Sequence, residues 1–493
     1  MNPDLINYEL SAPPQQSEIR TEEEEPLNPQ TSNTRTFKYK INNVGMLDGT
    51  SMFTFKLQKT AGATAGDRLR VNLWNGALGA IKSAVMRVGD FEIVNTQGLD
   101  RIATLRHLNK SVHVRNSMFG NYLGNNLNLH VASDASTVAL QGADRGVGQI
   151  RNAGNSINFG QQDDGTGAVV HDRSIVTDNT RNEKYGIPLY MLFPCLENRQ
   201  LPLFLFQDYP VILEITFNEA SKYINNVGKP AAGGYIALDT DIAIAEPKLV
   251  VDYVLPPSSV INDYIDQTSS QGYRFEYPRI NRVIKSIPAV AGDNQVQEVE
   301  HRLGQEGREI HQIYQFKRYS AATDPKAGAV LGNKVLLSQK IDGSMIEEYN
   351  VEVNGREVFS DFVFNNASQY NKVSQCLDDP LYCPRSFYYT DVNSQNAVIS
   401  NQTEGLRGVW KPLAVDLRNG NRDGNGRAVI VGGGTPISRG SQLIWKYRRE
   451  GKGSVANVSL DTKPAFDVEY HIIRDGVAVI KKLPKGTSVI VSA

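Results

Sequence analysis

The chain has 493 residues, 40% of them hydrophobic, which is enough apolar material for more than one domain core. Its 52 basic and 53 acidic residues give a formal net charge of −1, so bulk charge gives no reason to expect attraction to nucleic acid or membranes. The longest apolar concentration, residues 187–217, is split by Glu197 and Arg199, and no part of it has the roughly 18 unbroken apolar residues of a membrane helix.

The three cysteines, Cys195, Cys376 and Cys383, cannot form a full set of disulfides, and no signal peptide is recognisable. We therefore expect free thiols and folding in a reducing compartment. Cys376 and Cys383 could form half of a metal site, but no second pair exists to complete it, so no metal is expected. Four Asn-x-Ser/Thr sequons, expected to be unused without a secretory signal, begin at Asn109, Asn366, Asn401 and Asn457.

Residues 1–36 are predicted to form a flexible acidic arm, because they combine several prolines with seven acidic residues and only Arg20 and Arg35 as bases. Such an arm is either a solvated tail or a segment that crosses to a neighbouring subunit or lies under a shell. Its net charge of −5 argues against a grip on nucleic acid.

Beyond residue 36, apolar and polar residues alternate in several segments, which predicts strands buried on one face. These segments are 37–41, 53–57 and 69–73. Residues 83–94 contain a Gly89-Asp90 turn between two apolar runs, and apolar residues at a spacing of three predict a short helix over 99–108. Residues 109–186 are rich in Gly, Asn, Asp and Ser, and are predicted to be a long loop that protrudes from the surface.

Four prolines exclude a long helix in residues 187–217. Leu203–Phe206 is apolar throughout and is predicted to be a strand covered on both faces, whereas 211–217 alternates. We expect the two to form a hairpin that closes a first sandwich. Ile242–Leu255 follows, and Pro256-Pro257 is the predicted domain boundary.

The second half repeats this kind of pattern, with Asn354-Gly355 as a strong hairpin signal and a short helix predicted near 367–377. Asp475-Gly476 is predicted to be a turn, and 378–440 a second long loop region. The predicted strands of this half are 273–277, 310–319, 349–353, 443–447, 466–472 and 489–491.

Two landmarks recur at similar offsets. A strand, Gly turn, strand and short helix occur around Gly89 and again around Gly355, 266 residues later, and a proline-led alternating strand begins at Pro210 and again at Pro464, 254 residues later. The recurrence indicates a duplicated unit. The predicted fold is therefore all-β: two tandem eight-stranded antiparallel jelly rolls with short helices and long loop insertions, spanning 37–257 and 258–493.

At these landmarks the sequence resembles the double jelly-roll major capsid proteins of large eukaryotic DNA viruses, virophages and polinton-like viruses. Residues 81–93, with Val88-Gly89-Asp90, are similar to the strand, Gly turn and helix of the family's first roll. Residues 187–217, with Leu201-Pro202-Leu203, are similar to the hairpin that closes that roll. Residues 349–360, with Val353-Asn354-Gly355-Arg356, are similar to the Asn-Gly segment of its second roll. The likeness runs from about Phe37 to the C-terminus.

This resemblance implies a structural protein of the virion. Three copies would form a pseudo-hexagonal homotrimer that tiles an icosahedral shell, made and assembled inside the host cell. The loops at 109–186 and 378–440 would form outward towers or clasp neighbours. Partners would be neighbouring capsomers and minor capsid or penton proteins, without direct contact to nucleic acid.

No enzymatic signature is recognisable, so no catalytic, cofactor-binding or metal-binding residues are predicted. Asn419-Gly420-Asn421 begins like a calcium loop, but Ile430 stands at its twelfth position, where a bidentate Glu is needed. Lys446-Tyr447-Arg448-Arg449 is interpreted as the solvated face of a strand or a subunit contact. The alternatives are a β-sandwich carbohydrate-binding fibre or adhesin, which the dispersed Trp74, Trp410 and Trp445 do little to support, and a jelly-roll glycoside hydrolase with paired carboxylates.

Overall fold

The computed structural model of the chain places twenty-one segments, which carry the elements named below. The described residues are 17–28, 34–60, 69–71, 76–108, 123, 161–163, 169–171, 184–197, 200–206, 209–220, 223–226, 242–271, 273–291, 296–319, 346–363, 366–377, 412–418, 434–450, 462–463, 465–482 and 488–492.

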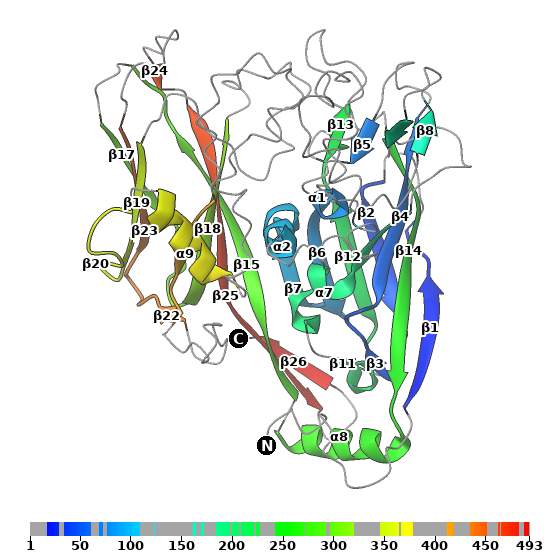
Figure 1. Cartoon of the computed structure of the whole chain (residues 1–493). Coiled ribbons are helices and arrows are strands. Elements are labelled where there is room, and N and C mark those ends of the chain that lie inside the picture. The colour runs from blue at the N-terminus through cyan, green and yellow to red at the C-terminus, as the bar shows by residue number, and fades with distance from the viewer. Residues whose placement is uncertain are drawn as a thin grey trace.

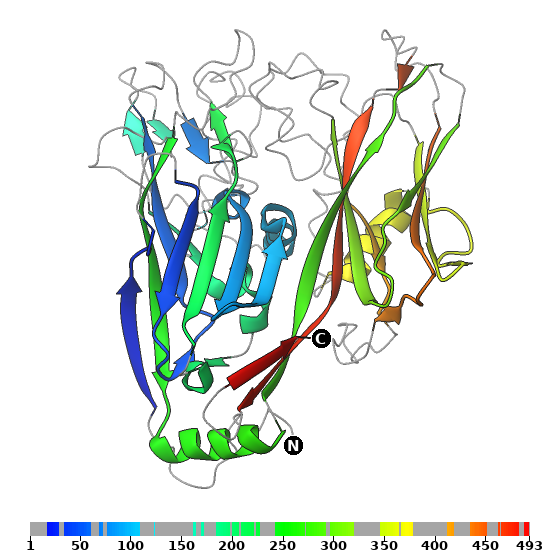
Figure 2. The ribbon, with the colours of Figure 1, turned by 180° about the vertical axis from the view of Figure 1, so that it is seen from behind.

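The first roll is a sandwich of two antiparallel sheets, seen at one side of the molecule in Figures 1 and 2. One sheet has the strand order β1-β14-β4-β10, and the other has the order β2-β12-β6-β7. Its strands are β1 (Glu18–Glu24), β2 (Thr36–Ile41), β4 (Met52–Lys59), β6 (Ile81–Val88), β7 (Phe91–Gln97), β10 (Lys184–Pro188), β12 (Val211–Phe217) and β14 (Ile242–Leu255).

The second roll lies beside the first and repeats its topology strand for strand. Its sheets have the orders β15-β25-β18-β21 and β17-β23-β19-β20. When the eight strands of each roll are counted along the chain, both rolls have the orders 1-8-3-6 and 2-7-4-5. The strands are β15 (Tyr273–Ile287), β17 (Gln297–Arg302), β18 (Glu309–Tyr319), β19 (Ile346–Val353), β20 (Arg356–Glu357), β21 (Leu413–Asp416), β23 (Leu443–Glu450) and β25 (Phe466–Lys482).

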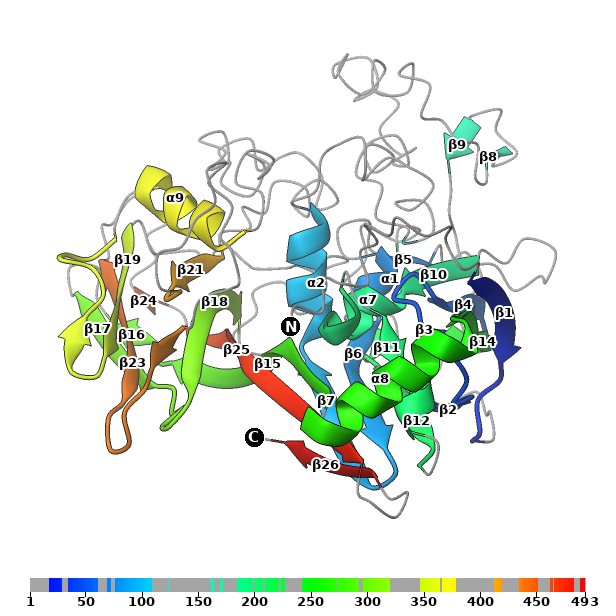
Figure 3. The same cartoon turned by 90° about the horizontal axis from the view of Figure 1, so that it is seen from below.

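Short helices and accessory strands complete the rolls. The helices are α1 (Gly76–Gly79), α2 (Leu99–Leu108), α7 (Leu189–Leu192), η6 (Pro194–Leu196), η7 (Leu203–Phe206), α8 (Ser258–Gln271) and α9 (Asn366–Cys376). The accessory strands are β3 (Met46–Leu47), β5 (Leu69–Val71), β8 (Gln161–Asp163), β9 (Val169–His171), β11 (Leu201–Pro202), β13 (Ile224–Asn226), β16 (Val290–Ala291), β22 (Thr435–Pro436), β24 (Thr462–Lys463) and β26 (Ser488–Ser492). Helix α8 links the rolls and runs across one end of the molecule (Figure 3).

The landmark at the two hairpins is confirmed. Gly89 (φ +57°) turns β6 into β7, and Asn354 and Gly355 (φ +54° and +74°) turn β19 into β20; the left-handed backbone at these turns explains the Gly and Asn. A short helix follows each hairpin, α2 in the first roll and α9 in the second. The second landmark is confirmed as two alternating strands, β12 after Pro210 and β25 after Pro464, but their equivalence is wrong, because β12 is the seventh strand of its roll and β25 the eighth.

Three local predictions are also wrong. Leu203–Phe206 is the 3₁₀ helix η7, since a short buried apolar run does not by itself distinguish strand from helix. Residues 187–217 do not form a hairpin, because β10 and β12 belong to opposite sheets. No turn occurs at Asp475-Gly476, where β25 continues in unbroken register with Pro278 and Tyr277 of β15.

The predicted acidic arm is corrected at its C-terminal half. Glu18–Glu24 forms β1, the first strand of the first roll, and pairs along its whole length with β14. The pairing is supported by an ion pair between Glu23 and Lys248 at 3.0 Å and a hydrogen bond from Thr21 Oγ1 to Asp252 Oδ1. The first roll therefore begins before residue 37. Residues 1–16, most of the predicted loop regions 109–186 and 378–440, and Cys383 lie outside the described residues.

Aromatic side chains fill both sandwiches. In the first roll, Phe217 makes edge-on contacts with Phe37, Phe53 and Phe55. In the second, Trp445 is fully buried and stacks on Tyr349 with 5.0 Å between ring centroids. Such pairs stabilise a core beyond the area they bury, so each roll has a well-packed core of its own.

Candidate functional site: the junction between the rolls

The middle of the sheet β15-β25-β18, around β25 and β18, is buried on both faces, whereas Ile284 on β15 remains 53% exposed. Val468, Tyr470 and Ile472 of β25 point into the core of the second roll. The alternate residues Glu469 and His471 are 3% and 0% exposed, although they point away from that core. The first roll covers them. We call this second surface the junction face; it consists of Glu469, His471 and Ile473 of β25 with Tyr314 and Phe316 of β18.

A cluster of charges lies on the junction face. The carboxylate of Glu469 is 2.7 Å from Nη2 of Arg282 on β15 and 3.7 Å from Nε of Arg101 on α2. Arg101 is 1% exposed, and its guanidinium lies over the ring of Phe316, 5.9 Å from the centroid. Burial alone would lower the pKa of Arg282, but the negative charges of Glu469 and Asp100 outweigh it and raise that pKa. The first roll thus contributes a buried cation that the second roll neutralises.

Close backbone approach accompanies the cluster. Gly98, at the start of α2, has φ +67°, and a Cβ on it would lie 2.3 Å from Cε1 of His471. Any side chain there would displace the imidazole, so Gly98 allows α2 to lie directly on β25. Nearer the end with α8, the hydroxyl of Tyr277 donates to the carbonyl of Ile93 on β7, and Arg279 lies 3.9 Å from Glu92. The junction therefore fixes the two rolls relative to each other.

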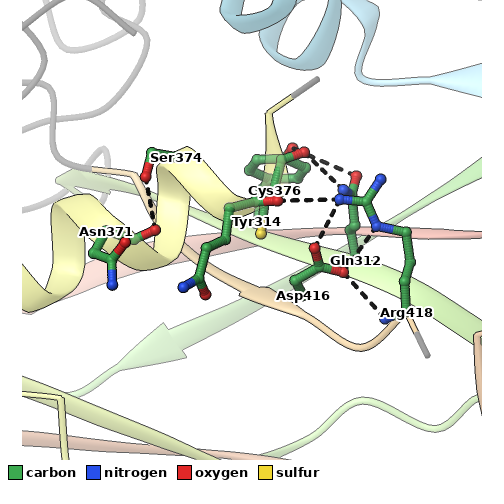
Figure 4. Close-up of polar contacts among 8 residues, drawn as sticks. Gln312, Tyr314, Asn371, Ser374, Cys376, Asp416 and Arg418 are labelled. Atoms are coloured by element: carbon green, nitrogen blue, oxygen red, sulfur yellow. Dashed lines mark hydrogen bonds and ion pairs between the residues drawn. The ribbon is translucent and has the colours of Figure 1, made fainter. Parts of the chain in front are cut away.

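Helix α9 follows the fifth strand of the second roll, as α2 does in the first, and Figure 4 shows which side chains contact its C-terminal end. The carbonyl of Cys376 accepts hydrogen bonds from Gln312 Nε2 at 2.7 Å and from the Tyr314 hydroxyl at 2.9 Å. Arg418, paired with Asp416 at 2.7 Å, donates to the carbonyl of Gln375. The last carbonyls of a helix have no hydrogen-bond partners within the helix, and a cation near them is stabilising. Arg418 and the two hydrogen bonds to Cys376 therefore stabilise the C-terminal end of α9.

The first roll carries a counterpart of the junction face that is exposed or half-exposed over β1 and the adjoining part of β14, although Val254 near the end of β14 packs against the cluster of Met46, Phe204 and Leu205. This counterpart is the outer surface of the sheet β1-β14-β4-β10, which we call the free face. It contains exposed Ile19 and Thr21 on β1 and half-exposed Val250 and Asp252 on β14. Ile19 is 70% exposed. An ion pair of Lys56 and Glu246 at 2.8 Å also lies on this sheet.

The described residues contain no group of three or more His, Cys, Asp or Glu side chains that could hold a metal. Cys195 and Cys376 are buried free thiols, and the calcium-like loop at Asn419 lies outside the described part of the chain. No described helix is both long and apolar enough to cross a membrane.

Of the basic cluster at 446–449, Lys446 and Arg448 lie on the partly exposed face of β23, whereas Tyr447 is buried in the core of the second roll. Lys446 pairs with Glu352 and Glu357, and Arg448 pairs with Glu298 and Glu348 across neighbouring strands. These acidic partners raise the pKa of Lys446. The positive charges of Lys446 and Arg448 are therefore already paired within the sheet.

No family model and no curated protein sequence matches the chain. Solved structures do. The capsid model of PBCV-1 virus matches with a TM-score of 0.54 at 12% identity, over 99% of this chain and 100% of that one. The PBCV-1 VP54 structure fitted into a reconstruction of the virophage Sputnik matches with a TM-score of 0.53 at 11% identity, over 98% and 99%. The predicted double jelly-roll fold is thereby confirmed.

Proposed function

We propose that this chain is a major capsid protein whose copies assemble into a viral shell. The observation that carries the proposal is that two equivalent rolls meet through unlike surfaces. The first roll contributes β7 and α2, and the second contributes the junction face. A contact between two unlike surfaces leaves one surface of each kind unpaired on the chain. The same contact can therefore form between successive copies until they close a ring. The fold shared with the PBCV-1 capsid supports the same conclusion.

The open surfaces can be named from strand equivalence. Val88 pairs with Phe91 in the first hairpin as Val353 pairs with Arg356 in the second, so Glu92 corresponds to Glu357. In the second roll, β20 is exposed and α9 is partly exposed; they are the counterparts, in chain order, of β7 and α2, which meet the neighbouring roll. We infer that β20 and α9 of one copy dock on the free face of the next. With two rolls per chain, a six-fold arrangement needs three chains.

The resulting particle would be a homotrimeric, pseudo-hexagonal capsomer that tiles an icosahedral shell with minor capsid or penton proteins, after assembly in the host cell. The protein would have no catalytic activity. The alternative of a carbohydrate-binding fibre or adhesin is less favoured, because Trp445 is buried in a core rather than displayed for stacking on a sugar.

Light scattering of the purified chain tests the proposal. A trimer has a mass of 3 × 54.5 = 163.5 kDa, and negative-stain images should show pseudo-hexagonal particles. Ile19→Asp places a charge on the free face and should shift the population toward monomer. Val296→Asp, at a similarly exposed apolar residue outside both surfaces, should leave the trimer intact. A wild-type chain that remains monomeric at micromolar concentration would contradict the proposal.

A further inference from the structure

Three arginines gather where β15 and β25 leave the core of the second roll. Arg474 follows Val468, Tyr470 and Ile472 on the same face of β25. It pairs across the sheet with Arg279 on β15 on one side and with Ile310 on β18 on the other. Arg308 lies two residues before Ile310 in the sequence. All three thus approach one point at the end of the sandwich, on the side toward β7 of the first roll.

Arg474 is buried without a counter-charge among the described residues. It is 7% exposed, and its Nε is buried with no hydrogen-bond partner there. Burial, together with the like charges of Arg279 and Arg308, lowers the pKa of Arg474 to about 10. A buried cation next to two others is unfavourable unless an anion joins them.

The nearby acids do not supply that anion. Glu92 lies 3.9 Å from Arg279, and both side chains are 35% exposed, so this is a loose pair at the rim. Glu306 and Glu309 flank Arg308 in the sequence, but neither forms an ion pair with these arginines within the described part of the chain. Counting Glu92, the group carries three positive charges and one negative, an excess of two.

The loop that carries Arg308 is shaped by its backbone. Gly304, Gln305 and Gly307 all have φ between +67° and +76°, and Arg308 N–H donates to the carbonyl of Gln305. The loop is tied to the neighbouring segment, because the N–H of Ile437 donates to the carbonyl of Arg308. The backbone of Arg308 is therefore held in place, which reduces the entropy lost when its side chain orders around a ligand.

We propose that Arg279, Arg308 and Arg474 form a binding site for a small, doubly charged oxyanion of the phosphate class. Guanidinium groups donate pairs of parallel N–H bonds to such oxygens, and the charge of a dianion matches the excess of two. Arg474 lies at the base of the site, and the more exposed Arg279 and Arg308 form its mouth. Phosphate in solution and a phosphate ester share this chemistry. The proposal is independent of shell assembly.

Calorimetric titration of the full-length protein at about pH 8, where phosphoryl groups carry two charges, tests the site. Sodium phosphate should bind saturably when compared with sodium chloride at equal ionic strength. Arg308→Gln and Arg279→Gln should each weaken binding about tenfold, the effect of losing one charge-assisted hydrogen bond. Arg302→Gln is the matched control, because it removes an exposed arginine from β17, and it should leave the dissociation constant within about twofold.

A second titration uses glycerol 3-phosphate. Binding equal to that of phosphate means that the mouth admits a phosphate ester, whereas binding of phosphate alone means that the site encloses a free ion; both support the site. Absence of saturable binding with either anion would overturn it. So would an Arg302→Gln effect as large as that of Arg308→Gln, because binding would then follow overall charge. Circular dichroism of each variant shows that the fold is retained.

Discussion

The carboxylate of Glu469 should be among the most sensitive polar groups in the chain. Glu469→Gln keeps the shape of the side chain and removes its charge. Arg282 at 2.7 Å and Arg101 at 3.7 Å would then lose their shared counter-ion, while Asp100 remains 3.9 Å from Arg101. Breaking one partner of a buried ion pair costs about 3–5 kcal/mol, because the remaining charge stays desolvated. We expect about 3 kcal/mol here, since Arg282 retains some exposure.

Differential scanning calorimetry and chemical denaturation measure this loss. Because the cluster joins the rolls rather than filling either core, the variant should also lose cooperativity, and a first transition should separate from the second. The matched control is Glu298→Gln. Glu298 pairs with Arg448 at 2.8 Å but is 61% exposed, so its loss should cost less than about 1 kcal/mol. If both variants unfold in one transition and within about 0.5 kcal/mol of each other, the charge cluster around Glu469 does not contribute to the coupling of the rolls.

Three further predictions concern the second roll and the junction. Burial lowers the pKa of His301 to about 4 from 6.5, so between these pH values His301 is neutral in the folded protein and protonated in the unfolded chain. Its contribution to stability is therefore complete above pH 6.5 and falls by up to about 3 kcal/mol toward pH 4. His301→Gln should remove this loss in pH-dependent denaturation. Gly355→Ala should cost only about 1 kcal/mol in the same assay, since its φ is +74° but no atom lies within 4 Å of the new Cβ. Gly98→Ala should lower the thermal midpoint more than Gly355→Ala, because its Cβ would meet the His471 ring at 2.3 Å, and an equal effect of the two would refute the tight approach of α2 to β25.

Local signals in the sequence were sufficient where an element packs one apolar side against the core and leaves the other side polar. Alternation at Phe37, Tyr39 and Ile41 predicted β2, and the Gly89 and Asn354-Gly355 turns predicted both hairpins. The spacing of apolar residues predicted α2. In each case the core side of the element is apolar and its other side is polar, so the pattern and the burial agree.

The sequence misled where distant pairing overrides local preference. The run of glutamates in β1 resembles a solvated tail, but β14 offers it a full antiparallel edge and Lys248 as a counter-charge. Asp475-Gly476 has turn chemistry, yet fifteen consecutive residues of β15 pair with β25 and carry the strand past it. Neither partner strand is near in sequence, so neither outcome could be read from a local window.

The contact between the two rolls could not be predicted from the sequence for a related reason. Polar residues alternating with apolar ones on β25 indicate a strand with one buried face, and this pattern is the same whether the polar face meets water or a second domain. Glu469 and His471 are buried because Arg101 reaches them from another roll, and nothing in the sequence links α2 to β25. A surface that assembles through charged groups therefore resembles a solvated one in sequence. By the same reasoning, the mixed charges of the free face are compatible with an interface, because its equivalent in the second roll includes the buried, charged Glu469.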